Sequence, residues 1–289
     1  MPPPPGGWRF PCRQPDAVWL AANRIQQSLT WLGHATFLLQ LSGINVLTDP
    51  HLSPRASPFS FMGPRRWVAP PLQASQLPHI DLVLISHNHY DHLDEATVRQ
   101  LLQQPGGPPQ FLVPLGLRRW FNARRISGVD ELDWWNALKF KSLTATFTPA
   151  QHWSGRGLWD RNRSLWGGWR LDGENGSSFF FAGDTGYSRD FLEIRARLGA
   201  VDLTALPIGA YAPRWFMAAS HVDPEEAVQM HLDLGARRSV AMHWGTFVLT
   251  DEPLDEPPLR LYRALERRGL SLSDFDVWEH GETRILPVK

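Results

Sequence analysis

The chain has 289 residues, 43% of them hydrophobic, which is enough for one large core or at most two domains of ordinary size. Its formal net charge is zero, so the overall charge gives no argument for nucleic-acid binding. The single cysteine, Cys12, excludes a disulfide within the chain and the zinc sites that use two cysteines.

The first segment, residues 1–15, reads "MPPPPGGWRFPCRQP" and lacks the apolar stretch of a secretory signal. We expect a poorly ordered, proline-rich tail here. No window reaches 18 consecutive apolar residues, so we expect a cytoplasmic protein without a membrane-spanning helix. The 14 tryptophans suit a core but also a lipid–water interface, which leaves peripheral contact with the inner face of a membrane open.

Strand-like and helical patterns alternate along the rest of the chain. Strands are expected at 28–41 and 44–50, with Gly43 in the turn between them, and at 80–87, 143–152, 177–184 and 237–244. Helices are expected at 94–103, with Asp94 as N-cap, at 223–235, with Pro224 in the first turn, and at 259–270. Since no repeat or linker divides the chain, we expect a single α/β sandwich domain over 1–289.

The sequence "LISHNHYDHLD" directly follows the apolar run that ends the strand expected at 80–87. His87 and His89 are two residues apart, so on an extended backbone both side chains point the same way. Ligand sites of α/β sheets gather outside the strand ends, and later strand-like runs also end in histidine or aspartate. The predicted metal ligands are His87, His89, Asp91, His92, His152, Asp184 and His243. Such ligands suit two adjacent divalent cations, zinc above all, and also accept iron or manganese.

The segment "HNHYDH" resembles the H-x-H-x-D-H motif of the metallo-β-lactamase superfamily. The ordered set "TWLGHATFLL", "LTDPHLSPRASPFSFMGPRR", "LISHNHYDHLD", "AQHW", "FFFAGDTGY", "PRWFM", "HVDPEEAV" and "MHWGTF" is similar to the N-acyl-phosphatidylethanolamine-hydrolysing phospholipase D family and its bacterial relatives. The resemblance implies an αββα four-layer sandwich with two Zn²⁺ per chain. It assigns one zinc to His87, His89 and His152 and the other to Asp91, His92 and His243, with Asp184 between the two ions.

The same resemblance implies a zinc-dependent phosphodiesterase of phospholipase D type. Its substrate would be N-acyl-phosphatidylethanolamine or a related glycerophospholipid, hydrolysed by a metal-bridging hydroxide to an N-acylethanolamine and phosphatidic acid. His221 matches a family active-site histidine and is, with Asp91, the catalytic candidate, for phosphate positioning or proton transfer. The alternatives are another hydrolase of this fold, such as a lactonase, a β-lactamase-like enzyme or a nuclease, and a non-catalytic lipid- or metal-binding protein. A nuclease usually carries an added domain, for which this chain has no room.

Two further groups of residues have a functional and a structural interpretation. Asp49 and His34 lie at strand ends, where they could orient a metal ligand or simply form a turn. Arginines interleave with aromatic residues in later segments, and Arg156, Trp159, Arg214 and Trp215 are the candidates for contacting an amphipathic phosphate ester. Core packing is the alternative for the aromatic residues. We therefore expect a phospholipid or other phosphodiester as partner and no nucleic acid, and a homodimer stays open.

Overall fold

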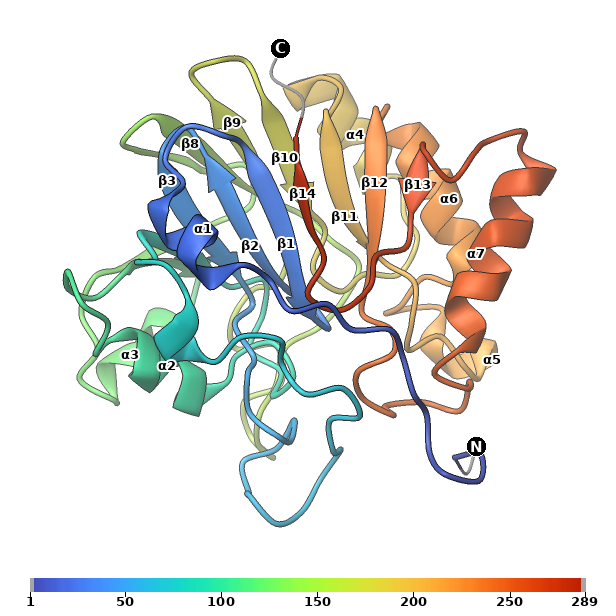
Figure 1. The fold of residues 1–289 in the computed structure, drawn as a ribbon, viewed down its shortest axis with the longest axis horizontal. Coiled ribbons are helices and arrows are strands. Elements are labelled where there is room, and N and C mark those ends of the chain that lie inside the picture. Colours follow the sequence, from blue (N-terminus) through green and yellow to red (C-terminus); the bar gives the residue numbers. More distant parts are fainter. Residues whose placement is uncertain (1–2, 287–289) are drawn as a thin grey trace.

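Two β-sheets packed face to face form the centre of the molecule, with helices over their outer sides (Figure 1). The computed structural model describes residues 3–286, and within them each sheet has seven strands. The first sheet has the order β14-β1-β2-β3-β4-β5-β6, and the second has the order β13-β12-β11-β10-β9-β8-β7. This arrangement is the predicted αββα sandwich.

The strands of the first sheet are β1 (Ser28–Gly33), β2 (Thr36–Leu41), β3 (Ile44–Thr48), β4 (Leu82–Leu84), β5 (Gln110–Pro114), β6 (Val129–Leu132) and β14 (Thr283–Ile285). Those of the second are β7 (Ala137–Phe140), β8 (Leu143–Thr148), β9 (Gly168–Gly173), β10 (Ser178–Phe181), β11 (Leu203–Pro207), β12 (Arg238–Met242) and β13 (Phe275–Asp276). The helices are α1 (Ala17–Ala22), η1 (Ala74–Gln76), α2 (Glu95–Leu101), α3 (Arg118–Asn122), α4 (Asp190–Leu198), α5 (Arg214–Met217), α6 (Pro224–Asp233) and α7 (Glu256–Arg267).

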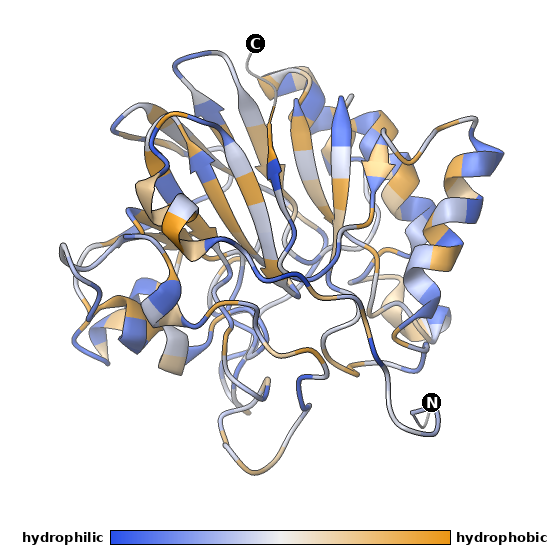
Figure 2. Ribbon diagram, in the orientation of Figure 1, coloured by the Kyte–Doolittle hydropathy of each residue, from blue (hydrophilic) through white to orange (hydrophobic). Residues whose placement is uncertain are grey.

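Strand β2 shows how the apolar pattern builds the layers. Phe37, Leu39 and Leu41 belong to the core between the sheets, whereas Leu38 packs in the second core, which also holds residues of α1, α2 and α3. Successive side chains of a strand point to opposite faces, so a strand buried on both faces needs apolar residues on both. Figure 2 shows this as hydrophobic colour along the central strands and mixed colours on the outer helices.

The strand expected at 28–41 is in fact a hairpin. Gly33 and His34 both have positive φ, +101° and 53°, and they turn the chain between β1 and β2. On its other side β1 pairs with β14, and the hydroxyls of Thr30 and Thr283 lie 2.8 Å apart. A segment from near the end of the described chain therefore completes the first sheet.

The helix signals at the start of α2 and α6 are confirmed. The Asp94 side chain accepts hydrogen bonds from the amides of Ala96 and Thr97. Asp223 caps α6, whose first residue is Pro224, a position where the missing N–H costs nothing. These caps end the loops that carry the candidate site residues.

The N-terminal segment contacts the body of the protein. Trp8 is buried against Trp67, with ring centroids 5.0 Å apart, and Cys12 forms an isolated β-bridge with His280. How well ordered residues 1–15 are in solution stays a prediction, and residues 1–2 lie outside the described chain. Over residues 3–286, no helix combines the length and the apolar character that crossing a membrane requires.

Candidate functional site

The structure brings the seven predicted ligand residues together at one edge of the sandwich. Residues 87–92 follow β4 of the first sheet, while His152, Asp184 and His243 follow β8, β10 and β12 of the second. Both sheets therefore supply side chains to the same place. Their ring and carboxylate atoms form overlapping groups whose members lie within 4.8 Å of one another.

The approach of the two sheets at this edge requires a glycine. Gly183 has a φ of +62°, and a Cβ there would lie 2.6 Å from the Cβ of Ser86. His243 also adopts a left-handed φ, 63°, which is uncommon for a residue other than glycine. These left-handed conformations lie next to Asp184 and at His243, where the two chain segments approach the end of strand β4.

Three imidazoles form the first group, which we call the three-histidine cluster: His87, His89 and His152. Nε2 of His87 lies 2.9 Å from Nδ1 of His89, which lies 3.2 Å from Nε2 of His152. Lone pairs of neutral imidazoles repel at this distance unless a proton or a cation lies between them. Ligand atoms held 2.0–2.1 Å from a tetrahedral ion are about 3.3 Å apart, so this spacing fits a metal ion.

The second group, the aspartate cluster, consists of Asp91, His92 and His243. The Nε2 atoms of the two histidines are 3.2 Å apart, and Oδ2 of Asp91 lies 3.2 Å from the first and 3.4 Å from the second. Asp184 lies between the two clusters: its carboxylate is 3.0 Å from His92, 3.1 Å from His243 and 3.9 Å from Nε2 of both His87 and His152. The carboxylate of Asp184 can therefore bind two adjacent cations, one in each cluster.

Hydrogen bonds outside the clusters fix which ring nitrogen faces inward. Nδ1 of His92 donates to Asp49, 2.7 Å away, and Nδ1 of His87 donates to the Ser86 hydroxyl, 2.8 Å away. That hydroxyl donates in turn to Asp49 at 2.5 Å. Nδ1 of His152 donates to the Ser220 carbonyl at 2.9 Å. The three Nε2 atoms are thereby turned toward the clusters, which is the usual arrangement around metal-binding histidines.

These contacts place the two predicted supporting residues and add two more. Asp49 holds His92, and His34 lies 2.9 Å from Asp91 through its Nε2. Ser86 and Ser220 are new: Ser86 directly precedes the first histidine of the motif, a position that could have suggested its role. Ser220 acts through its backbone carbonyl, which every residue type has, so the sequence could not have indicated this contact.

Charge separates the two clusters. Burial and the neighbouring imidazoles lower the pKa of His87 well below its ordinary value, and burial with His152 lowers that of His89 to about 3. Burial also lowers the pKa of His243, but the Asp184 carboxylate outweighs it and raises the value to about 9. Burial raises the pKa of Asp184, but His243 and His92 hold it well below the usual range. The three-histidine cluster is therefore neutral at pH 7, while the aspartate cluster pairs protonated imidazole with carboxylate.

His221 lies beside the clusters and is buried. Its Nδ1 is 4.0 Å from Oδ2 of Asp184 and has no hydrogen-bond partner within residues 3–286. Burial lowers its pKa to about 3, although Asp184 opposes the shift, so the ring is neutral near pH 7. Arg214 holds the loop in place: Nη1 donates to the His221 carbonyl and Nη2 donates to Glu226. Arg214 is thus committed to structure, and contact with a substrate stays a prediction.

Arg156 is also turned inward. Its Nη1 donates to the carbonyls of Asn88 and Leu93, both at 2.8 Å, and its guanidinium stacks on Tyr90 with 3.9 Å from Cζ to the ring centroid. Arg156 therefore braces the loop that carries the motif. A direct contact with substrate stays a prediction for this residue.

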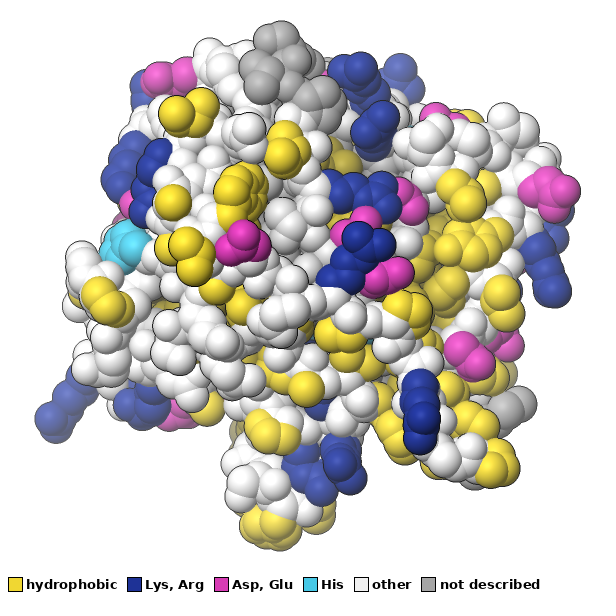
Figure 3. All heavy atoms as spheres, in the orientation of Figure 1, with side chains coloured by type: hydrophobic (Ala, Val, Ile, Leu, Met, Phe, Trp, Pro, Cys, Tyr) yellow, Lys and Arg dark blue, Asp and Glu magenta, His cyan; other side chains and the backbone are white. Residues whose placement is uncertain are grey.

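Aromatic and aliphatic side chains around the site point into solvent. Trp159 and Trp215 are each 86% exposed, the opposite of the core packing considered for them. Further exposed residues lie on the same loops and on the loop that hangs below the sheets in Figure 1. We call this set the apolar rim: Phe59, Phe61, Met62, Leu158, Trp159, Trp215 and Phe216. In Figure 3 hydrophobic side chains cover the tip of that lowest loop, with Lys or Arg side chains behind them.

Comparison with known proteins agrees with this geometry. The model of the beta-lactamase superfamily domain matches residues 44–244. An N-acyl-phosphatidylethanolamine-hydrolyzing phospholipase D of Caenorhabditis elegans is 43% identical over 88% of this chain and 74% of its own. An uncharacterized protein of Mycobacterium tuberculosis is 44% identical over 91% of this chain and 70% of its own. Among solved structures, a metallo hydrolase from Ignicoccus hospitalis has a TM-score of 0.69 at 22% identity, covering 92% of this chain and all of its own.

Fold, ligand-type side chains and relatives together define a metal-dependent hydrolase with the metallo-β-lactamase fold. Within that superfamily, the chain belongs to the family of the N-acyl-phosphatidylethanolamine-hydrolysing phospholipases D.

Proposed function

We propose that this protein is a zinc-dependent phosphodiesterase that hydrolyses N-acyl-phosphatidylethanolamine or a related glycerophospholipid. The reaction adds water across the bond between phosphorus and the ethanolamine oxygen, giving an N-acylethanolamine and phosphatidic acid. The observation that carries this proposal is the 43% identity with a relative named for that activity, across nearly the whole chain. The two clusters support it because their donors suit two adjacent zinc ions.

The residues of the chain have separate tasks in this proposal. Two bound ions would supply an activated water and positive charge near a phosphoryl oxygen. Asp184 and Asp91 hold the clusters together, and Asp49 keeps His92 in the required tautomer. His221 is neutral and its Nδ1 has no partner beside Asp184 among the described residues. With the ring proton on Nδ1 it could donate a hydrogen bond to a phosphate oxygen, and it could hand a proton to the departing oxygen after taking one from the activated water.

The proposal also includes contact with a lipid surface through the apolar rim. Each part of the rim is joined to a site loop: Trp159 follows Arg156, which binds the motif loop, and Trp215 follows Arg214, which binds the His221 carbonyl. Phe59 lines the same surface hollow as Tyr90 and Arg156. Exposed aromatic residues next to arginines are typical of headgroup interfaces. A lipid held there would have its phosphate near the clusters.

A substrate panel tests the reaction. Purified, zinc-loaded protein is given N-acyl-phosphatidylethanolamine in mixed micelles, a chromogenic phosphodiester, an acyl-homoserine lactone and a cephalosporin, and products are followed by mass spectrometry. We expect N-acylethanolamine and phosphatidic acid in equal amounts and the highest kcat/KM on the lipid. Faster turnover of the lactone or the cephalosporin would assign the site to carbonyl chemistry instead.

A double variant tests the lipid surface. Trp159→Ala with Trp215→Ala removes two exposed side chains and leaves Arg156 and Arg214 in place. We expect loss of vesicle binding and about tenfold lower turnover of micellar lipid, because remote binding energy positions the phosphorus. Turnover of the soluble phosphodiester should stay unchanged. Equal losses on both substrates would mean that the tryptophans support the fold.

A further inference from the structure

A cavity of about 360 Å³ opens at the end of the sandwich opposite the metal clusters. The first residues of β10, β11 and β12 line it, whereas the cluster residues follow the last residues of β10 and β12. The five residues of β12 span about 17 Å, so the cavity is separate from the metal site. Its volume lies within the range of sites for small molecules.

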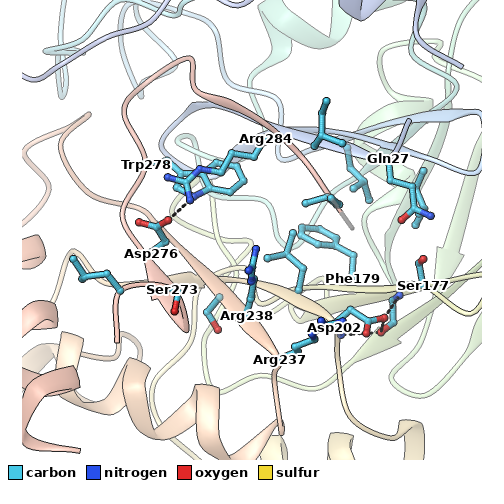
Figure 4. A pocket seen from close by; sticks show the side chains of 18 residues that line it. Gln27, Ser177, Phe179, Asp202, Arg237, Arg238, Ser273, Asp276, Trp278 and Arg284 are labelled. Carbon is cyan, nitrogen blue, oxygen red and sulfur yellow. Dashed lines mark hydrogen bonds and ion pairs between the residues drawn. The ribbon is translucent and has the colours of Figure 1, made fainter. Parts of the chain in front are cut away.

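Apolar side chains form a continuous part of the walls of this cavity, beside polar and charged ones. Leu39 and Leu41 of β2, Phe179 of β10 and Leu203 of β11 contribute, together with Ile285 of β14. Figure 4 shows Phe179 in the middle of these side chains, with Gln27 and Trp278 on opposite sides of it. These apolar side chains could pack against the hydrocarbon part of a ligand.

Two buried polar groups on the walls lack partners within the described chain. The Ser177 hydroxyl and the indole N–H of Trp278 make no hydrogen bond to any residue from 3 to 286. Leaving such groups unpaired costs about 1–3 kcal/mol each, so a ligand with acceptor atoms would relieve that cost.

Two arginines, Arg237 and Arg238, lie at the start of β12. Arg284 is already paired with Asp276 and Glu282. Arg237 and Arg238 have no ion pair within 4 Å among residues 3–286, although Arg238 interacts electrostatically with Asp274 and Asp202 also lines the cavity. In Figure 4 the Arg238 side chain extends between Asp276 and Phe179. A carboxylate is the group that two neighbouring guanidiniums bind best.

From these walls, unpaired donors and arginines we infer a second ligand site, which binds a small amphipathic monocarboxylate such as a medium-chain fatty acid. The hydrocarbon lies against Leu39, Leu203 and Phe179, and the carboxylate faces Arg237 and Arg238. The site is independent of the proposed reaction, since none of its lining residues belongs to either metal cluster.

Decanoate, decylamine and decanol, kept below their micelle concentrations, are the probes, and binding to the zinc-loaded full chain is measured by calorimetry. We expect one saturable site for decanoate and weaker binding of neutral decanol and cationic decylammonium. Arg237→Gln with Arg238→Gln should weaken decanoate binding at least about tenfold, the worth of a charge-assisted hydrogen bond. Arg263→Gln, an exposed arginine on α7, is the matched control and should bind as the parent does.

Leu203→Phe tests the apolar part by filling the cavity, and it should also abolish binding. A circular dichroism spectrum and a zinc content like those of the parent show that each variant is folded, and the double arginine variant changes only exposed side chains, so it should keep its fold. The inference is overturned if decanoate does not saturate, if decylammonium binds as tightly, or if the double arginine variant binds decanoate like the parent.

Discussion

The two metal clusters lie side by side, yet they differ in charge. The three-histidine cluster has only imidazoles, whose pKa values burial keeps low, so each ring is neutral at pH 7 and keeps one nitrogen lone pair for a cation. The aspartate cluster adds a carboxylate and lies closer to Asp184, which raises the pKa of His243 to about 9. The carboxylates of Asp184 and Asp91 thus hold a proton on His243 that a cation must displace, whereas the three-histidine cluster has no such proton to lose.

The largest effect should come from the residue that both clusters share. Asp184→Asn keeps the size of the side chain but removes the charge near both cations, so bound zinc should fall below two equivalents. Hydrolysis should fall by more than the roughly 10–100-fold that loss of a ligand's supporting partner costs. Elemental analysis and kcat measure this, with the exposed Asp255→Asn as a surface control and circular dichroism as the check of folding. Two tightly held zinc ions in the variant would remove Asp184 from the ligand set.

His221→Ala should separate chemistry from metal binding. The ring lies beside Asp184 but outside the two clusters, so the zinc content should stay at the parent level. Turnover should fall by about 10²–10⁴-fold, as for loss of a general acid or base. His79→Ala, which changes a histidine near the opposite end of β4, should leave both values unchanged. Zinc loss in the His221 variant would make this residue a ligand.

Asp49→Asn should weaken one cluster more than the other. Asp49 accepts the Nδ1–H of His92 directly, but it reaches His87 only through Ser86. The ion of the aspartate cluster should therefore bind about 10–100-fold more weakly, with a smaller change for the other ion. Stepwise zinc titration resolves the two affinities. Equal weakening at both would show that the two clusters respond as one unit.

The pH dependence of metal binding sharpens the comparison further. A folded-state pKa of about 9 for His243 means that a proton must leave before a cation binds, so affinity in the aspartate cluster should rise as pH rises from 6 toward 9. One displaced proton corresponds to about tenfold per pH unit. The pKa of His89, about 3, lies below this window, so affinity in the three-histidine cluster should stay flat. Zinc titrations at several pH values measure both slopes, and equal slopes would contradict the charge difference.

The fold could be predicted from sequence where local patterns were strong. Asp94 and Pro224 mark helix starts because capping depends on a few adjacent residues. The turn at Gly33 and His34 was missed, since apolar residues continue on both sides of it and only the backbone angles reveal it. The β1–β14 pairing depends on contacts between distant segments, which periodicity does not report.

The candidate site followed from residue type and from strand ends, and the structure places those seven side chains within reach of one another. Side-chain direction could not be predicted in the same way. The sequence predicts phosphate contacts for Arg156 and Arg214, which stay predictions, but it did not predict that their guanidiniums bind the backbone carbonyls of Asn88 and His221. An arginine near an aromatic residue has the same sequence signature in either orientation, and only packing decides between them.

The pairing of β14 with β1 has a consequence for synthesis of the chain. Thr30 and Thr283 are separated by 253 positions, so at 5–20 residues per second the first strand emerges roughly 13–50 s before its partner. During that interval the nascent protein exposes an open β1 edge of unpaired amides and carbonyls, the kind of edge that recruits other chains. Until β14 has emerged, assistance from chaperones would therefore matter most at this edge of the first sheet.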